Sequence, residues 1–143
     1  MIYSTTQRQT GVTASLQIYN LGQIKAKQMN GYILLSHGSK IKASNEASFE
    51  VLEKLRGKIE HVELAFLELA EPNFESAVRL LKESGVSSIK VLPLFLAPGK
   101  HVREDVPVLR EMCVKKYGVE ITVLDYIGSN DGYVGLIESI LLS

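Results

Sequence analysis

Short apolar runs and longer amphipathic stretches alternate along the chain from residue 29 onward. Four runs are apolar enough to predict buried strands, at residues 31–36, 61–69, 87–97 and 119–127. The stretches that follow them carry apolar residues every three or four positions, and they predict helices at residues 42–58, 71–85, about 101–117 and 131–142. Parallel neighbours need helical crossovers, so this alternation predicts an α/β fold in which a four-stranded parallel sheet has helices on both faces.

Two of the predicted helices have informative details. In the helix at 42–58, an apolar residue recurs every four positions, at Ala43, Ala47, Val51 and Leu55. In the helix at 101–117, we expect Pro107 in the first turn, because a proline further inside removes a backbone hydrogen bond and clashes with the preceding turn. Cys113 falls on the apolar side of this helix and is expected to be part of the core.

Composition adds limits on function and compartment. The 143 residues suit one domain, and 16 basic residues balance 16 acidic ones, which gives no global attraction to nucleic acid or to an anionic membrane. A single cysteine excludes an internal disulfide and fits a reducing, cytoplasmic location. No apolar run approaches the ~20 residues of a membrane span. Residues 1–28 lack the apolar core of a secretory signal, so we treat them as an N-terminal extension, a candidate for disorder, and place the domain at 29–143.

Candidate chemistry gathers where the predicted strands end. The first strand runs directly into His37, the second ends at Glu68 and Glu71, and the third is followed by His101. The carboxyl ends of parallel strands share one edge of the sheet, which is where ligands bind in open α/β folds. Imidazole and carboxylate suit a divalent metal such as Fe, Co, Ni or Zn, and imidazole also accepts protons near neutral pH. His61 begins the second strand and is assigned to the opposite edge, without a functional role.

Simpler interpretations stand beside this one. A histidine that follows a strand, as His37 does, is often a polar loop residue that caps a helix or bonds to the backbone. Glu68 is also compatible with a solvent-facing position at the end of a strand. Glu71 is better explained by attraction to the N-terminus of the next helix. The Gly99–Lys100 pair lacks the preceding glycine and following Ser or Thr of a phosphate-binding loop, and neither a hydrolase elbow nor a G-x-G-x-x-G motif is present. Nucleotide binding therefore has no support.

Three blocks carry a family resemblance: ILLSHGSK, AFLELAEPNFESAV and VLPLFLAPGKHVREDVP. In this order they resemble the short-form sirohydrochlorin chelatases, class II enzymes that insert Co, Fe or Ni into a tetrapyrrole without ATP. The resemblance covers about residue 31 to the end, and it implies a flavodoxin-like, chelatase-like three-layer sandwich. It also implies that His37 and His101 hold the metal and serve catalysis, with Glu68 as a third metal contact.

The resemblance further implies a substrate site and a partner. Its expected substrate-binding residues are Gly38, Ser39, Lys40, Gly99, Lys100 and Arg103. Lys40 stands where many relatives carry Arg, and it offers a point charge to a substrate carboxylate. Gly38 and Gly99 either allow close backbone approach or positive φ, or are plain turn residues. A half-sized chain implies a homodimer that closes a cleft around sirohydrochlorin.

Several alternatives remain at this stage. Cobalt is the favoured metal, with iron second, and nickel is a further option. A metal or tetrapyrrole carrier would keep the histidines without catalysing insertion. A phosphohistidine phosphatase also places His-Gly after a first strand, but it needs an arginine where this chain has Ser36.

Overall fold

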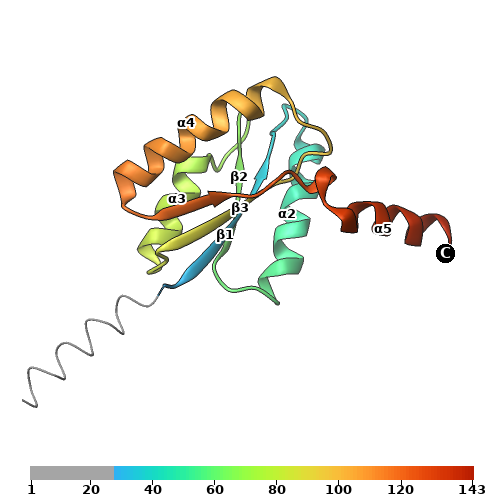
Figure 1. The fold of residues 1–143 in the computed structure, drawn as a ribbon, viewed down its shortest axis with the longest axis horizontal. Helices are drawn as coiled ribbons and strands as arrows, with labels where there is room; N and C mark the ends of the chain where they lie inside the picture. Colours follow the sequence, from blue (N-terminus) through green and yellow to red (C-terminus); the bar gives the residue numbers. More distant parts are fainter. Residues whose placement is uncertain (1–27) are drawn as a thin grey trace, which may run out of the picture.

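A computed structural model describes residues 28–143 of the chain. The strands are β1 (Asn30–Ser36), β2 (Val62–Phe66), β3 (Ser88–Pro93) and β4 (Glu120–Val123). The helices are α2 (Lys42–Arg56), α3 (Phe74–Glu83), α4 (Lys100–Tyr117) and α5 (Asp131–Leu141), and a short 3-10 helix, η1 (Ile127–Ser129), precedes the last of them. All four predicted strands and all four predicted helices are therefore present (Figure 1). No helix in this described part is both long and apolar enough to cross a membrane.

The strands form one parallel sheet in the order β2-β1-β3-β4. Helices α3 and α4 lie on one face of the sheet and α2 lies on the other (Figure 1). The predicted three-layer α/β arrangement is confirmed. The crossover from β1 leads to β2 on one side of the sheet, and the crossover from β3 leads to β4 on the other side. The crossovers therefore diverge at the carboxyl ends of the neighbouring strands β1 and β3, which is where ligands bind in folds of this kind.

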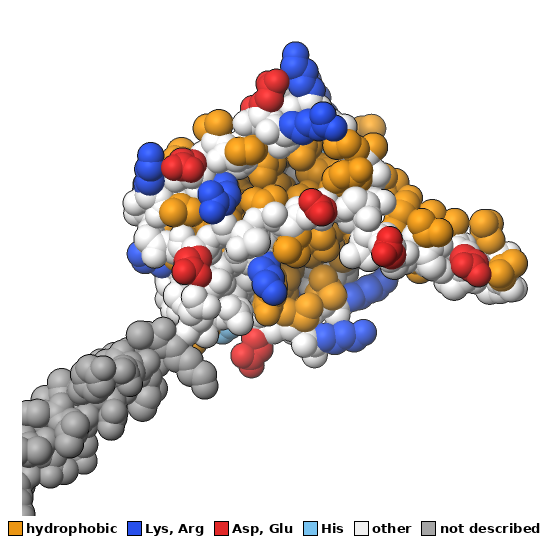
Figure 2. Space-filling view, viewed as in Figure 1, with side chains coloured by type: hydrophobic (Ala, Val, Ile, Leu, Met, Phe, Trp, Pro, Cys, Tyr) orange, Lys and Arg blue, Asp and Glu red, His pale blue; other side chains and the backbone are white. Residues whose placement is uncertain are grey.

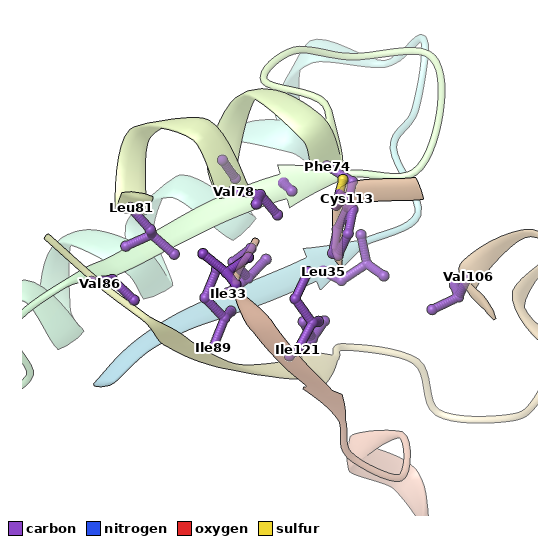
Figure 3. Packing of buried hydrophobic residues seen from close by; sticks show 14 residues of the cluster. Ile33, Leu35, Phe74, Val78, Leu81, Val86, Ile89, Val106, Cys113 and Ile121 are labelled. Atoms are coloured by element: carbon purple, nitrogen blue, oxygen red, sulfur yellow. The ribbon is translucent and has the colours of Figure 1, made fainter. Parts of the chain in front are cut away.

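Two apolar cores separate along the faces of the sheet. The larger core lies under α3 and α4, and its residues converge from β1, β3, β4 and both helices (Figure 3). Cys113 is fully buried within it, as the helical spacing predicted. The smaller core lies under α2 and centres on Leu34, Leu52 and Phe66. Among the described residues, no polar or charged side chain is buried, so the fold rests on apolar packing.

Helix α2 presents an unexpected side to the sheet. Leu52 is its buried residue, whereas Ala43, Ala47 and Val51 are exposed. The inner side also holds Ser48, whose hydroxyl lies 3.0 Å from that of Ser36 on β1. The predicted four-residue period was counted on apolar residues alone. It therefore missed Ser48, which can face inward because its hydroxyl has a hydrogen-bonding partner.

Three predicted strands are too long at their carboxyl ends. β2 ends at residue 66 instead of 69, β3 at 93 instead of 97, and β4 at 123 instead of 127. Leu69 has a φ of 63°, which is incompatible with a continuing strand. The apolar residues beyond these ends belong to loops, and these loops build the edge of the sheet where the candidate site lies.

Pro107 lies deeper in its helix than predicted. α4 begins at Lys100, with Gly99 as its N-cap residue, so Pro107 stands beyond the first turn. The expectation of a first-turn proline is therefore wrong. Proline leaves the carbonyl of Arg103 without its helical donor, and both residues are exposed, so water can donate to that carbonyl instead.

Helix α5 leaves the body of the molecule (Figure 1). The predicted helix is present, but it does not lie on the sheet. In the part of the chain that the structure describes, its one substantial packing partner is η1. Figure 2 shows hydrophobic side chains along this projecting arm.

Candidate functional site

Two loops are held tightly together at the carboxyl edge of β1 and β2. The backbone N–H of Glu68 donates to the carbonyl of His37 at 3.0 Å, and that of Leu67 donates to Ser36 at 2.9 Å. Gly38 makes this approach possible, since a Cβ at that position would lie 1.7 Å from the carbonyl oxygen of Glu68. Its φ of 95° also favours glycine. Close backbone approach and positive φ, the two functional roles expected for Gly38, are both confirmed.

The same contact brings an imidazole to a carboxylate. His37 Nε2 lies 3.1 Å from Glu68 Oε1, and the two side chains are 48% and 49% exposed. The rings of His37 and Phe95 are arranged edge to face, with a centroid distance of 6.1 Å and an interplanar angle of 78°, which restricts the orientation of the imidazole. A half-exposed imidazole–carboxylate pair can accept a proton or contribute two ligands to a metal.

The third predicted ligand lies at the start of α4. Helix α4 places the backbone of His101 in its first turn, but the side chain of His101 lies outside what the structure describes. The predicted sharing of an ion by His37 and His101 therefore stays a prediction. Across the described side chains, no group of three or more His, Cys, Asp or Glu residues is arranged to hold a metal.

A hollow of about 300 Å³ lies between α4 and Glu68 of the His37–Glu68 pair. Its lining includes Glu68 from the β2 loop and Asp105 from α4, beside the apolar side chains of Leu67, Val108 and Leu109. Asp105 follows His101 by four residues, the spacing that places two residues on one side of a helix. The sequence prediction omitted Asp105, although this spacing was a usable signal.

Ser39 shapes the loop after β1. Its backbone N–H donates to Asn45 Oδ1 at 3.0 Å, Asn45 Nδ2 returns a bond to the Ser39 carbonyl at 2.8 Å, and the Ser39 hydroxyl accepts from the N–H of Ile41. Asn45 is a second residue that the sequence prediction omitted, and no motif pointed to it. These bonds hold the loop that carries His37 and the exposed Lys40.

The other expected substrate-binding residues cluster near the start of α4. Lys100 and Arg103 are exposed, and Arg103 lines a second hollow of about 410 Å³ between α4 and the end of β4. Gly99 has a φ of −96°, and a Cβ there would meet no atom closer than 3.9 Å. The expectation of positive φ at Gly99 is therefore wrong, and Gly99 serves as the N-cap residue of α4. Its expected close approach to the substrate stays a prediction.

The residues assigned structural roles behave as predicted. His61 lies at the opposite edge of the sheet, directly before β2, where its carbonyl accepts from the N–H of Tyr32. The carboxylate of Glu71 accepts from the N–H of Asn73, the N-cap residue of α3, at 3.1 Å. Neither side chain joins the His37–Glu68 pair among the described contacts.

Comparisons with known proteins identify the family of this chain. Residues 31–141 match the sequence model of the CbiX family. A sirohydrochlorin cobaltochelatase of Methanopyrus kandleri is 40% identical over 81 residues, which are 55% of this chain and 57% of that protein. The chain thus spans little more than half of that relative.

Two solved structures extend the comparison. A putative cobalamin biosynthesis CbiX protein of Marinobacter aquaeolei has a TM-score of 0.73 and 35% identity, over 79% of this chain and 94% of that one. SirB of Bacillus subtilis, solved with Fe³⁺, has a TM-score of 0.70 and 26% identity, over 78% of this chain and 46% of that one. On its sequence, its fold and its motifs, this chain belongs to the CbiX family.

Proposed function

We propose that this chain inserts a divalent metal into sirohydrochlorin without ATP, with cobalt as the favoured metal and iron as the second. The observation that carries this proposal is the His37–Glu68 pair, 3.1 Å apart at the carboxyl edge of the sheet, within the segment that matches the CbiX family. The cobaltochelatase name of the M. kandleri relative supports cobalt, and the SirB structure with Fe³⁺ supports iron. Residues 29–143 form the catalytic domain in this proposal, and the enzyme acts in the cytoplasm.

Metal insertion makes two demands on the proposed site. The ring must lose two pyrrolic protons, so a base has to stand near the ring nitrogens, and His37 or His101 takes that role. The metal must also be held loosely, because a closed four-ligand cage would retain it instead of delivering it. His37 and Glu68 are half-exposed. In this proposal His101 completes an open set of ligands with them.

The acidic substrate requires cations and enclosure. We propose that Gly38 and Ser39 shape the ring-binding edge with Gly99, and that Lys40, Lys100 and Arg103 meet the substrate carboxylates. A single copy offers only one wall to the macrocycle, whereas ligand sites usually bury most of their ligand. The length of SirB, of which this chain covers 46%, supports a homodimer in which a second copy provides the other wall.

Anaerobic insertion assays test the function directly. The purified protein is incubated with sirohydrochlorin and Co²⁺, Fe²⁺ or Ni²⁺ in turn, and the visible spectrum follows product formation. We expect many turnovers per protein with cobalt, and a fall of about 10²–10⁴-fold in kcat when His37→Ala or His101→Ala removes a base.

A control variant at the third histidine distinguishes an effect on the proposed site from a general effect on the protein. His61→Asn changes the third histidine at the opposite edge, and Asn tolerates the positive φ of 55° found there. This variant should keep wild-type activity. Binding of the ring or metal without turnover would identify a carrier instead of a chelatase, and full activity in His37→Ala would refute the assignment of that residue.

A further inference from the structure

Two separate contacts hold the loop that follows β1, one on each side of Gly38. On the side of β1, the carbonyl of His37 accepts from the N–H of Glu68 at 3.0 Å, which ties this part of the loop to the β2 loop. Beyond Gly38, the backbone of Ser39 is bonded to Asn45 of α2. Gly38 itself restrains little, because glycine has more backbone freedom than any other residue. The half of the loop after Gly38 therefore depends on its contact with α2.

Asn45 bonds to both backbone groups of Ser39. The N–H of Ser39 donates to Asn45 Oδ1 at 3.0 Å, and Asn45 Nδ2 donates to the carbonyl of Ser39 at 2.8 Å. Both contacts are partly buried. A planar amide carries a donor and an acceptor side by side, whereas a carboxylate only accepts. The two bonds together fix the peptide groups on either side of Ser39, and a single bond would fix only one of them.

Lys40 lies in a tight turn directly after this contact. The N–H of Ile41 donates to the hydroxyl of Ser39 at 3.0 Å, and the carbonyl of Ile41 accepts from the N–H of Ser44 at 3.1 Å. The backbone of Lys40 is thus restrained on both sides, while the residue is exposed. Among the described residues Lys40 forms no ion pair, so its charge is available to an anion.

We propose that Asn45 is a positioning residue for substrate binding: it holds Ser39 and Lys40 in the conformation in which Lys40 meets a carboxylate of the tetrapyrrole. This role belongs to the chelatase site proposed above and rests on that function. A flexible loop would have to be ordered at the moment of binding, and such ordering lowers affinity. The two bonds from Asn45 supply this order in the free protein.

The two restraints act on different parts of the site. The N–H of Glu68 holds the part of the loop that carries His37, the proposed metal ligand, whereas Asn45 holds the part that carries Lys40. Loss of the Asn45 side chain should therefore weaken binding of the tetrapyrrole and leave binding of the metal unchanged. A purely structural role of Asn45 would weaken both in step with the loss of stability.

Two titrations of the full-length protein test this separation. Sirohydrochlorin is added to the metal-free protein and its visible absorbance is followed, and Co²⁺ is titrated separately into the protein without sirohydrochlorin. We expect Asn45→Ala to raise the Kd for sirohydrochlorin about tenfold, because the loop loses its preformed order. The Kd for Co²⁺ should stay at the wild-type value.

Asn73 provides the matched control. Its side chain also bonds to backbone, since Asn73 Oδ1 accepts from the N–H of Ser76 at 2.9 Å at the start of α3. Asn73→Ala should therefore lower the stability in urea as Asn45→Ala does, but it should change neither Kd. A rise in the Kd for sirohydrochlorin of equal size in both variants would show that stability alone is responsible, which overturns the positioning role.

An isosteric pair of variants gives the same test with a smaller change to the fold. In Asn45→Asp the carboxylate still accepts from the N–H of Ser39, but it cannot donate to the Ser39 carbonyl. Asn73→Asp adds the same charge and loses no bond, because an N-cap residue uses only its acceptor and Asp caps as well as Asn. The Kd for sirohydrochlorin should rise in Asn45→Asp and stay at the wild-type value in Asn73→Asp.

A double-mutant cycle identifies the residue through which Asn45 acts. Once Lys40→Ala has removed the charge, the further change Asn45→Ala should have little effect on the Kd for sirohydrochlorin. Full additivity of the two changes, or a wild-type Kd in Asn45→Ala, would overturn the positioning role while metal insertion by the wild type still supports the chelatase function. Failure of the wild type to bind sirohydrochlorin would overturn the proposed function, and the role of Asn45 with it.

Discussion

Replacement of Gly38 by alanine tests how the candidate site is held together. The new Cβ would lie 1.7 Å from the carbonyl oxygen of Glu68, so the two loops must separate by about 1.3 Å to reach the 3.0 Å limit of real Cβ contacts. A residue other than glycine at φ 95° adds about 1–3 kcal/mol. Loss of the Glu68 N–H bond to His37 adds about 0.5–1.5 kcal/mol. The free energy of unfolding should therefore fall by about 2–4 kcal/mol.

Urea denaturation measures this loss, and metal insertion measures its effect on the site. Displacement of about 1 Å at a catalytic pair typically costs on the order of 10²-fold in rate. Gly57→Ala is the matched control, since its Cβ would meet no atom within 4 Å and its φ is −75°. Gly38→Ala with the wild-type urea midpoint and full activity would refute the tight apposition of the two loops.

Three further predictions concern single side chains. Glu68→Gln keeps the shape of the side chain but removes its charge, so the rate of metal insertion should fall at least tenfold. The control variant Glu71→Gln should keep wild-type activity. Equal insertion rates in the two variants would exclude Glu68 from the site. Cys113 should resist thiol reagents in the native protein at pH 8 and react only in urea, because burial raises its pKa to about 11; rapid native labelling would contradict its burial. Hydrogen bonds from Lys116 and Tyr117 lower the pKa of Glu75, so this group stabilises the fold above its unfolded pKa of about 4.3, and the stabilisation is lost as pH falls through the lower folded pKa. The free energy of unfolding of Glu75→Gln should therefore depend less on pH below about 4 than that of the wild type. Identical acid-unfolding profiles of the two proteins would contradict the lowered pKa of Glu75.

Much of the architecture follows from local pattern. Strand and helix alternation depends on short-range periodicity, so the sequence indicated every described strand and α-helix, but not the 3-10 helix η1. Right-handed crossovers then require a parallel sheet, and its carboxyl ends share an edge. For that reason His37 and Glu68 were assigned to one site from sequence, and the structure places them 3.1 Å apart.

Hydrogen bonds between side chains of different elements and loops could be identified only from the tertiary structure. The inner side of α2 includes Ser48 because Ser36 lies opposite, and Asn45 matters because the Ser39 loop folds back onto it. Neither contact has a local signal, since each joins residues that come together only after the chain has packed.

The sequence by itself determined the elements, their parallel order and the chemistry at one edge, because periodicity and residue type are local properties. Only the tertiary structure decided that the backbone of Gly38 approaches that of Glu68, that Gly99 is the N-cap residue of α4, and that α5 leaves the sheet. Backbone approach and helix direction are set by the packing of distant segments, and no window along the chain contains that information.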